Sequence, residues 1–154
     1  MLRLKDIMTT QITAATPDMN LREAIDLLST NHISGVPVVD RGRVVGVLSS
    51  TDLLAFVATL DDAQPSVAFR TRRPPLDEVT VADMMTHDVQ SLGPDCSVEL
   101  AASFMRRSQI HRVLVMKDQV LVGIVTTTDL AAAIADHKIR SRTYVLAETT
   151  SQTC

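Results

Sequence analysis

The feature that most constrains the fold of this chain is an internal duplication. When the sequence is shifted by 77 positions, so that Asp6 falls on Asp83, its two halves align without a gap. The identical pairs include Asp6/Asp83, Met8/Met85, Thr9/Thr86, Pro17/Pro94, Asp18/Asp95, Gly46/Gly123, Thr51/Thr128 and Asp52/Asp129. Because one offset accounts for all of them, the 154 residues are predicted to hold two copies of one structural unit.

Each copy has the pattern of a short strand, a helix, two strands and a second helix. In the first copy, Asn20 and Glu23 match a capping box, and apolar residues then recur at helical spacing through about residue 31. The β-branched runs "VPVV" and "VVGVL" flank the polar turn "DRGR", which predicts a hairpin, and a helix is expected from near Ser50. In the second copy, Ser97 takes the cap position, "VLVM" and "LVGIV" are the strands, and the last helix begins near Leu130.

Strand runs as apolar as "VVGVL" need cover on both faces, so neither copy is expected to be stable alone. The prediction is an α/β (α+β) fold, in which two β-α-β-β-α repeats pack pseudo-symmetrically and helices lie on one side of small mixed sheets. Repeat 1 is assigned to residues 1–60, a linker to 61–80, repeat 2 to 81–137 and a flexible polar tail to 138–154. The linker holds the basic cluster Arg70, Arg72 and Arg73, which is interpreted as a solvated face.

Four motifs recur in order in both copies. They are "DIMT" before the first strand, "PD" before the first helix, "ISGVPVVD" on the second strand, and Gly-h-h-Ser/Thr-x-x-Asp (h, apolar) at the end of the third. In these motifs the chain resembles a tandem pair of CBS domains (the cystathionine β-synthase repeat), a Bateman module, in the form of a small stand-alone protein. The resemblance implies adenosyl ligands (AMP, ADP, ATP or S-adenosylmethionine) bound in clefts between the repeats. It also implies no catalytic activity, a homodimer, and regulation of another protein.

The repeated Ser/Thr-x-x-Asp motif has a chemistry that suits such ligands. By the resemblance, Asp52 and Asp129 occupy the ribose position, where one carboxylate can accept from both hydroxyls of the sugar. Ser49 and Thr126, three residues earlier, begin a helix whose N-terminus favours an anion such as phosphate. Gly46 and Gly123 would let the backbone approach a ligand closely. The alternative is that Ser/Thr-x-x-Asp only caps the helix.

By analogy with the family, each cleft combines residues of both repeats. Cleft 1 is expected to contain Thr9, Ala14, Ile33, Ser34, Gly35, Val36, Pro37, Thr126, Thr128 and Asp129. Cleft 2 is expected to contain Ser49, Thr51, Asp52, Thr86, Ser91, Ile110, His111, Arg112 and Val113. His111 and Arg112, which replace Ser34 and Gly35 of the first copy, resemble a basic pair that contacts phosphate. A phosphate contact would favour AMP, ADP or ATP over S-adenosylmethionine, because the planar guanidinium bonds phosphate bidentately. The alternative is a surface pair of basic residues.

Composition argues against several other functions. The net charge of -3 and the few aromatic residues give no basis for nucleic-acid binding. No apolar run approaches the roughly 18 residues of a membrane span, and the first ten residues lack the apolar core of a signal peptide. The two cysteines form no disulfide framework. A cytoplasmic location is therefore expected. His32, His87 and His137 are scattered, which predicts no metal site.

The expected function is therefore that of a non-catalytic sensor. The chain should need no cofactor, bind an adenine nucleotide as ligand, and signal through a homodimer to an unidentified regulated protein. Two alternatives remain: a ligand-independent adaptor that serves for dimerisation or scaffolding, and a sensor of S-adenosylmethionine. An enzyme is not expected, since no nucleophile lies in a pattern with a base.

Overall fold

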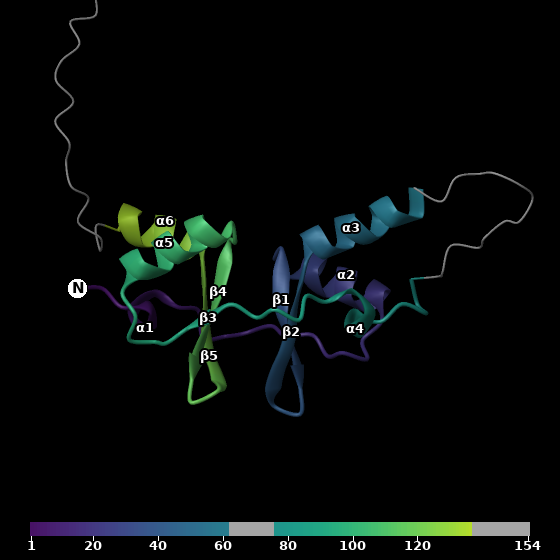
Figure 1. Cartoon of the computed structure of the whole chain (residues 1–154), viewed down its shortest axis with the longest axis horizontal. Coiled ribbons are helices and arrows are strands. Elements are labelled where there is room, and N and C mark those ends of the chain that lie inside the picture. Colours follow the sequence, from purple (N-terminus) through teal and green to yellow (C-terminus); the bar gives the residue numbers. More distant parts are fainter. Residues whose placement is uncertain (62–75, 137–154) are drawn as a thin grey trace, which may run out of the picture.

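The computed structural model describes residues 1–61 and 76–136, and the duplication is visible as two similar bodies side by side (Figure 1). In chain order the elements are α1 (Leu4–Ile7), α2 (Leu21–Thr30), β1 (Gly35–Asp40), β2 (Arg43–Ser49), α3 (Ser50–Asp61), α4 (Val81–Met84), β3 (Ser91–Leu92), α5 (Val98–Ser108), β4 (Arg112–Lys117), β5 (Val120–Thr126) and α6 (Thr127–Ala135). The arginine cluster of the predicted linker, His137 and the predicted tail lie outside the described residues.

The first repeat confirms the predicted helix cap and hairpin. The Asn20 side chain accepts from the Glu23 backbone N–H at 2.9 Å, and the Glu23 carboxylate accepts from the Asn20 N–H at 3.0 Å, which closes the capping box of α2. β1 and β2 pair antiparallel, with Gly35 opposite Ser49 and Asp40 opposite Arg43. The predicted first strand is shorter than expected, because only Ala15 forms a bridge, to Val38 of β1. Pro17 follows two residues later and has no N–H to extend the pairing.

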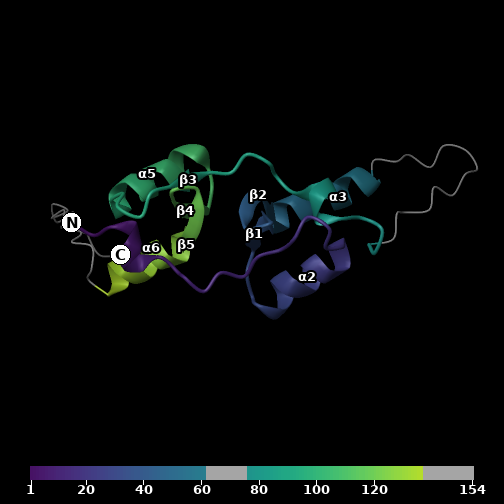
Figure 2. The same cartoon turned by 90° about the horizontal axis from the view of Figure 1, so that it is seen from below.

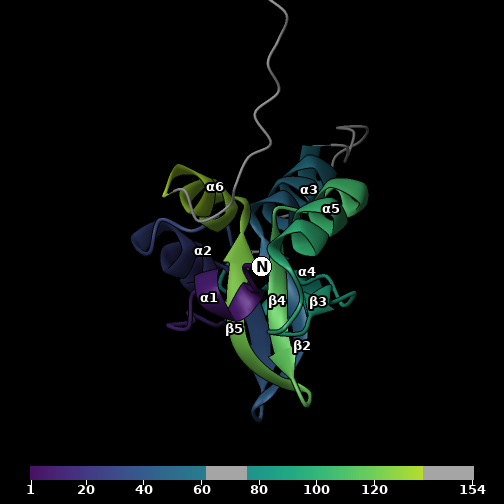
Figure 3. The ribbon, with the colours of Figure 1, turned by 90° about the vertical axis from the view of Figure 1, so that its left-hand side faces the viewer.

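The second repeat has the mixed sheet that the sequence predicted. β3 lies parallel to β4, with Ser91 opposite Leu114, and β4 pairs antiparallel with β5. The Ser97 hydroxyl accepts from the Leu100 N–H at 3.1 Å, which confirms Ser97 as the cap of α5. Figure 1 shows α2 and α3 on the outer side of β1 and β2, and α5 and α6 on the outer side of β4 and β5. In the view along the long axis, α2 and α6 lie to the left of the strands and α3 and α5 to the right (Figure 3).

Two four-residue helices, α1 and α4, were not predicted, and they are exchanged between the repeats. Leu4 of α1 is fully buried in the core of the second repeat, with Val98 and Val113. Val81 of α4 is fully buried in the core of the first, with Val36 among its neighbours. Figure 2 shows α1 beside α6 and β5, and α4 beside α3. Each repeat therefore supplies a segment that completes the core of the other.

Backbone pairing fixes the exchanged segments beside the third strand of the opposite repeat. Thr9 and Ile124 of β5 exchange two hydrogen bonds of 2.9 and 3.0 Å, and Thr86 and Val47 of β2 exchange two of 2.9 Å. This pairing places Thr9 next to the start of α6 and Thr86 next to the start of α3. It is the reason that each cleft contains residues of both repeats.

The glycines of the repeated motif face this exchanged segment, and the expectation that they make room for a ligand was wrong. A Cβ on Gly46 would lie 2.8 Å from the Met85 sulfur, and a Cβ on Gly123 would overlap the Met8 sulfur. Both methionines pack against the hydrophobic cores of the opposite repeats. Glycine is needed here because the exchanged methionine occupies the space of a side chain.

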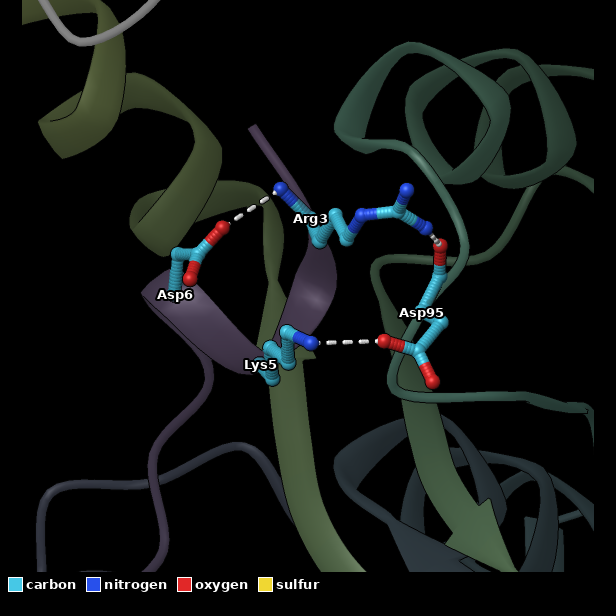
Figure 4. A network of polar contacts seen from close by, with 4 residues as sticks. All are labelled: Arg3, Lys5, Asp6 and Asp95. Carbon is cyan, nitrogen blue, oxygen red and sulfur yellow. Dashed lines mark hydrogen bonds and ion pairs between the residues drawn. The ribbon is translucent and has the colours of Figure 1, made fainter. Parts of the chain in front are cut away.

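Polar contacts attach α1 to the loop before α5 (Figure 4). The Arg3 guanidinium donates to the Asp95 carbonyl oxygen at 2.6 Å, and the Lys5 ammonium lies 2.7 Å from the Asp95 carboxylate. The Arg3 backbone N–H donates to Asp6 at 2.8 Å. The hydrogen bond from Lys5 lowers the pKa of the Asp95 carboxyl. The contacts are exposed to solvent, so they orient α1 more than they stabilise the fold.

Candidate functional site

Two cavities lie between the repeats, one at the N-terminus of each final helix. Cleft 1, of about 360 Å³, is at the start of α6 and is lined by Thr9, Gln11, Ile12, Thr13, His32, Ile33, Ser34, Gly35, His111, Arg112, Ile124, Thr126, Thr127, Thr128 and Asp129. Cleft 2, of about 280 Å³, is at the start of α3 and is lined by Val47, Ser49, Thr51, Asp52, Thr86, Asp88, Gln90, Gln109, Ile110, His111, Arg112 and Leu114. Small-molecule sites measure roughly 300–1,000 Å³, so both cavities are near the lower end of that range.

Most residues that the sequence singled out line these cavities. In cleft 1 the exceptions are Ala14, Val36 and Pro37, of which Val36 and Pro37 are buried in the core instead. In cleft 2 the exceptions are Ser91, on the outer strand β3, and Val113, which is fully buried. For Val113 the reason is the alternation of a strand, because its neighbour Leu114 faces the other side of the sheet and lines cleft 2.

The structure also brings in residues that sequence reasoning missed. Gln11, Ile12, Thr13 and His32 line cleft 1, and Asp88, Gln90 and Gln109 line cleft 2. Each lies within two residues of a predicted position, so the available signal was its place in the segments that enter each cleft. Polar side chains there show little periodicity, which is why they did not stand out.

In cleft 1, Asp129 is held in a capping box at the start of α6. Its Oδ2 accepts from the Thr126 backbone N–H at 2.7 Å and from the Thr126 hydroxyl at 2.9 Å. The Asp129 backbone N–H in turn donates a hydrogen bond to the Thr126 hydroxyl oxygen at 3.3 Å. Both bonds to the carboxylate use Oδ2, and within the described part of the chain Oδ1 accepts none. Asp129 is thus both a member of the capping box and the candidate ligand group. Its Oδ2 is bonded to Thr126, and its Oδ1 is available to a ligand.

In cleft 2, Asp52 has no such free oxygen. Its Oδ2 accepts from the Ser49 N–H at 2.7 Å and from the Ser49 hydroxyl at 3.0 Å. Its Oδ1 accepts from the hydroxyl of Thr86, in the exchanged segment, at 2.9 Å. Thr9 is the counterpart of Thr86 in cleft 1, but among the described residues no hydrogen bond joins it to Asp129. The two clefts are therefore chemically unequal.

Arg112 is the cation that both clefts share. It begins β4 and lines both cavities together with His111. Its guanidinium donates to the Ser34 hydroxyl at 2.6 Å and occupies the space where a side chain of Gly35 would begin. Burial lowers the pKa of Arg112, and the nearby Asp52 carboxylate acts in the opposite direction. A half-buried guanidinium between two cavities is suited to attract an anion into either.

Comparison with known proteins agrees with this geometry. The sequence model of the CBS domain matches residues 4–59 and again residues 81–136. The chain belongs to the CBS domain family. The resemblance seen in the sequence is confirmed, and the two matches coincide with the two repeats.

A bacterial relative matches over nearly the whole CBS pair. The "CBS domain-containing protein YhcV" of Bacillus subtilis (strain 168) is 32% identical over 132 residues, which cover 85% of this chain and 84% of the relative. A second relative, the uncharacterised protein MJ1426 of Methanocaldococcus jannaschii, is 32% identical over 85% of this chain and 90% of its own length.

Two solved structures of similar chains contain ligands. CBSX2 in complex with AMP has a TM-score of 0.73 at 25% identity, and the match covers 90% of this chain and all of the other. The CBS domain pair of MJ0100, in complex with 5′-methylthioadenosine and S-adenosyl-L-methionine, has a TM-score of 0.72 at 26% identity, covering 88% and 97% of the two chains. CBS pairs of this kind are, in general, regulatory modules without catalytic activity.

Across residues 1–61 and 76–136, no helix combines the length and the apolar character needed to cross a bilayer. In the same ranges, no three histidine, cysteine or acidic side chains come together as metal ligands would.

Proposed function

We propose that this chain is a non-catalytic cytoplasmic sensor that binds an adenine nucleotide between its two CBS repeats. Occupancy of the clefts is signalled to a partner protein through a homodimer. The observation that carries the proposal is the juxtaposition, in cleft 1, of Asp129 with an available oxygen, the N-terminus of α6 and the Arg112 guanidinium. These groups match a ribose and a phosphate within one cavity.

The ribose is assigned to Asp129 because of its free Oδ1. A carboxylate oxygen can accept from both ribose hydroxyls, and each charge-assisted hydrogen bond contributes about 1.5–3 kcal/mol. The capping box holds the other oxygen, so the carboxylate is oriented before the ligand arrives. Less conformational freedom is then lost on binding.

The phosphate is assigned to the backbone N–H groups that begin α6 and to Arg112. A helix N-terminus carries unpaired N–H donors and a partial positive charge, and Thr126, Thr127 and Thr128 line the cavity there. With a guanidinium on the same cavity, AMP, ADP or ATP fits better than a ligand without phosphate. The complex of CBSX2 with AMP supports this assignment by similarity.

A sensor of S-adenosylmethionine is the second candidate. It is favoured by the similar CBS pair of MJ0100, whose structure holds S-adenosyl-L-methionine. This ligand carries a positive sulfonium and no phosphate, so the carboxylate of its amino-acid part would be its only anionic group for Arg112. A ligand-independent adaptor is favoured by the exposed apolar residues Leu54 of α3 and Ile134 of α6, which are 70% and 52% exposed.

A thermal-shift panel with AMP, ADP, ATP and S-adenosylmethionine tests the proposal on the wild type and two variants. A ligand at about 100 times its dissociation constant adds about 2.7 kcal/mol to the free energy of unfolding. Asp129→Ala should abolish the part of the shift that comes from cleft 1. Asp83→Ala is the matched control, because Asp83 forms the same contacts with Thr80 at α4, where it lines neither cleft.

Both substitutions remove a capping interaction, so each should lower stability without ligand by roughly 0.5–2 kcal/mol. Only Asp129→Ala should change the response to nucleotide. If none of the four ligands moves the melting temperature of the wild type, the sensor proposal is wrong and the adaptor is favoured. If only S-adenosylmethionine moves it, the nucleotide assignment is wrong.

A further inference from the structure

The two repeats differ most informatively at a pair of equivalent positions, Gly35 and Arg112. The offset of 77 residues places Arg112 of β4 on Gly35 of β1. In the fold, Arg112 reaches across to its own counterpart: the guanidinium overlaps the position of a Cβ on Gly35 and bonds the neighbouring Ser34 hydroxyl at 2.6 Å. Two arginines could not both occupy this space. The pair therefore supplies one guanidinium where a symmetric molecule would have two or none.

This guanidinium lies where the two clefts meet. Cleft 1 presents Ser34 to it, and cleft 2 presents Asp52, whose carboxylate opposes the lowering of the Arg112 pKa that burial causes. Of the described histidines, His111 lines both cavities and His32 lines cleft 1 only. Neither cleft has a lysine or an arginine of its own in its lining. Each cleft thus depends on the same side chain for a permanent positive charge.

We propose that Arg112 is a shared phosphate ligand that couples the two clefts, so that a phosphorylated ligand in one cleft weakens the binding of a second in the other. This inference rests on the proposed nucleotide function and adds its regulation. A planar guanidinium that bonds one phosphate bidentately has turned its fork toward that cleft. A second phosphate then meets a cleft without its cation. By linkage, the weakening is equal in both directions.

The coupling should depend on phosphate and on Arg112 alone. Isothermal titration calorimetry with AMP is expected to give two binding events per chain, the second about tenfold or more weaker than the first, since coupling of this kind spans about 5–150-fold. Adenosine, which lacks the phosphate, should give two events much closer in affinity. In Arg112→Gln, AMP should behave as adenosine does.

Single-cleft variants separate sharing from simple inequality of the sites. Asp129→Ala leaves cleft 2 for AMP, and Asp52→Ala leaves cleft 1. If Arg112 serves both clefts, adding Arg112→Gln to either variant should weaken AMP binding by about tenfold or more, as loss of a charged phosphate contact does. If it serves one cleft only, just one background responds, and the proposal is overturned.

Further outcomes are equally decisive. Equal ratios of the two affinities for AMP and for adenosine would overturn the coupling while leaving nucleotide binding intact. Absence of binding by AMP, ADP, ATP and adenosine would overturn the proposed function and the coupling together. Ser34→Ala removes the hydrogen bond that holds the guanidinium on the side of cleft 1. The affinity of AMP for cleft 2 should then rise relative to its affinity for cleft 1.

Discussion

Asp52 and Asp129 occupy matched positions but keep different capacities for hydrogen bonding. The Oδ1 of Asp129 accepts no hydrogen bond within the described residues, whereas the Oδ1 of Asp52 accepts from the Thr86 hydroxyl at 2.9 Å. A ribose entering cleft 1 therefore adds hydrogen bonds. A ribose entering cleft 2 has to replace one that already exists, so its net gain is smaller.

This difference predicts the effect of Thr86→Val. Removing the hydroxyl frees the Oδ1 of Asp52, so adenosine should bind cleft 2 more tightly by about 1 kcal/mol, roughly fivefold. The measurement is calorimetry in the Asp129→Ala background, where only cleft 2 binds. Thr9→Val in the Asp52→Ala background is the matched control and should change affinity much less. Weaker binding by the Thr86 variant would mean that this hydroxyl contacts the ligand.

At the residue scale the sequence predicted where the two carboxylates lie, but not which of their oxygens already accept hydrogen bonds. The repeated Ser/Thr-x-x-Asp pattern was enough to place Asp52 and Asp129 at helix starts, where they are found. An alignment of the repeats places Thr9 and Thr86 at equivalent positions. It does not reveal that, of the two hydroxyls, only that of Thr86 donates a hydrogen bond to the aspartate of its cleft, Asp52. The same alignment showed that Arg112 replaces Gly35, but the meeting of these two residues depends on the way the repeats face each other.

The two hairpins share a tight turn and differ in its chemistry. In the β1–β2 turn the central residues Arg41 and Gly42 have φ of 48° and 79°, and in the β4–β5 turn Asp118 and Gln119 have φ of 50° and 64°. Two consecutive positive φ angles are typical of the two-residue turns that suit twisted hairpins. Glycine adopts them without steric cost, whereas a residue with a Cβ loses about 1–2 kcal/mol.

The substitution Gln119→Gly should therefore stabilise the second hairpin. The expected gain is about 0.5–1 kcal/mol after allowance for the greater freedom of glycine in the unfolded chain, which corresponds to a rise of roughly 1–4 °C in melting temperature. Calorimetry of the wild type and the variant measures it. Gly42→Gln is the reverse control and should lower the melting temperature by a similar amount, because nothing near Gly42 would clash. A lower melting temperature for Gln119→Gly would contradict the argument.

Among the elements, the long ones followed from the sequence and the shortest did not. The caps Asn20 and Ser97 and the β-branched runs predicted α2, α5 and both hairpins, because these signals are local. Helices α1 and α4 are four residues long, too short for a periodic pattern and too short to be stable alone. They form because Leu4 and Val81 are buried in the opposite repeat, which is a long-range effect.

For the whole molecule, the exchange of α1 and α4 means that neither core is complete without the other repeat. Leu4 belongs to the cluster of Val98, Val113 and Val125, and its counterpart Val81 belongs to the cluster of Val36 and Leu48. The two clefts lie along the same boundary, so the surfaces proposed to bind ligand are also surfaces through which the repeats meet. Unfolding of one repeat should expose the core of the other, and the molecule is expected to unfold as one unit.

This cooperativity is tested by Leu4→Ala, with Val81→Ala as its counterpart. Truncating a buried leucine should lower the free energy of unfolding by about 2–5 kcal/mol, and truncating the smaller valine by less. Hydrogen exchange measured by mass spectrometry reports protection separately for β1–β2 and for β4–β5. If the molecule is one cooperative unit, Leu4→Ala reduces protection in both hairpins by the same free energy, although Leu4 touches only the second core. If Leu4→Ala affects residues 112–126 alone and Val81→Ala affects residues 35–49 alone, the repeats unfold independently and their cooperation is limited to the binding of ligand.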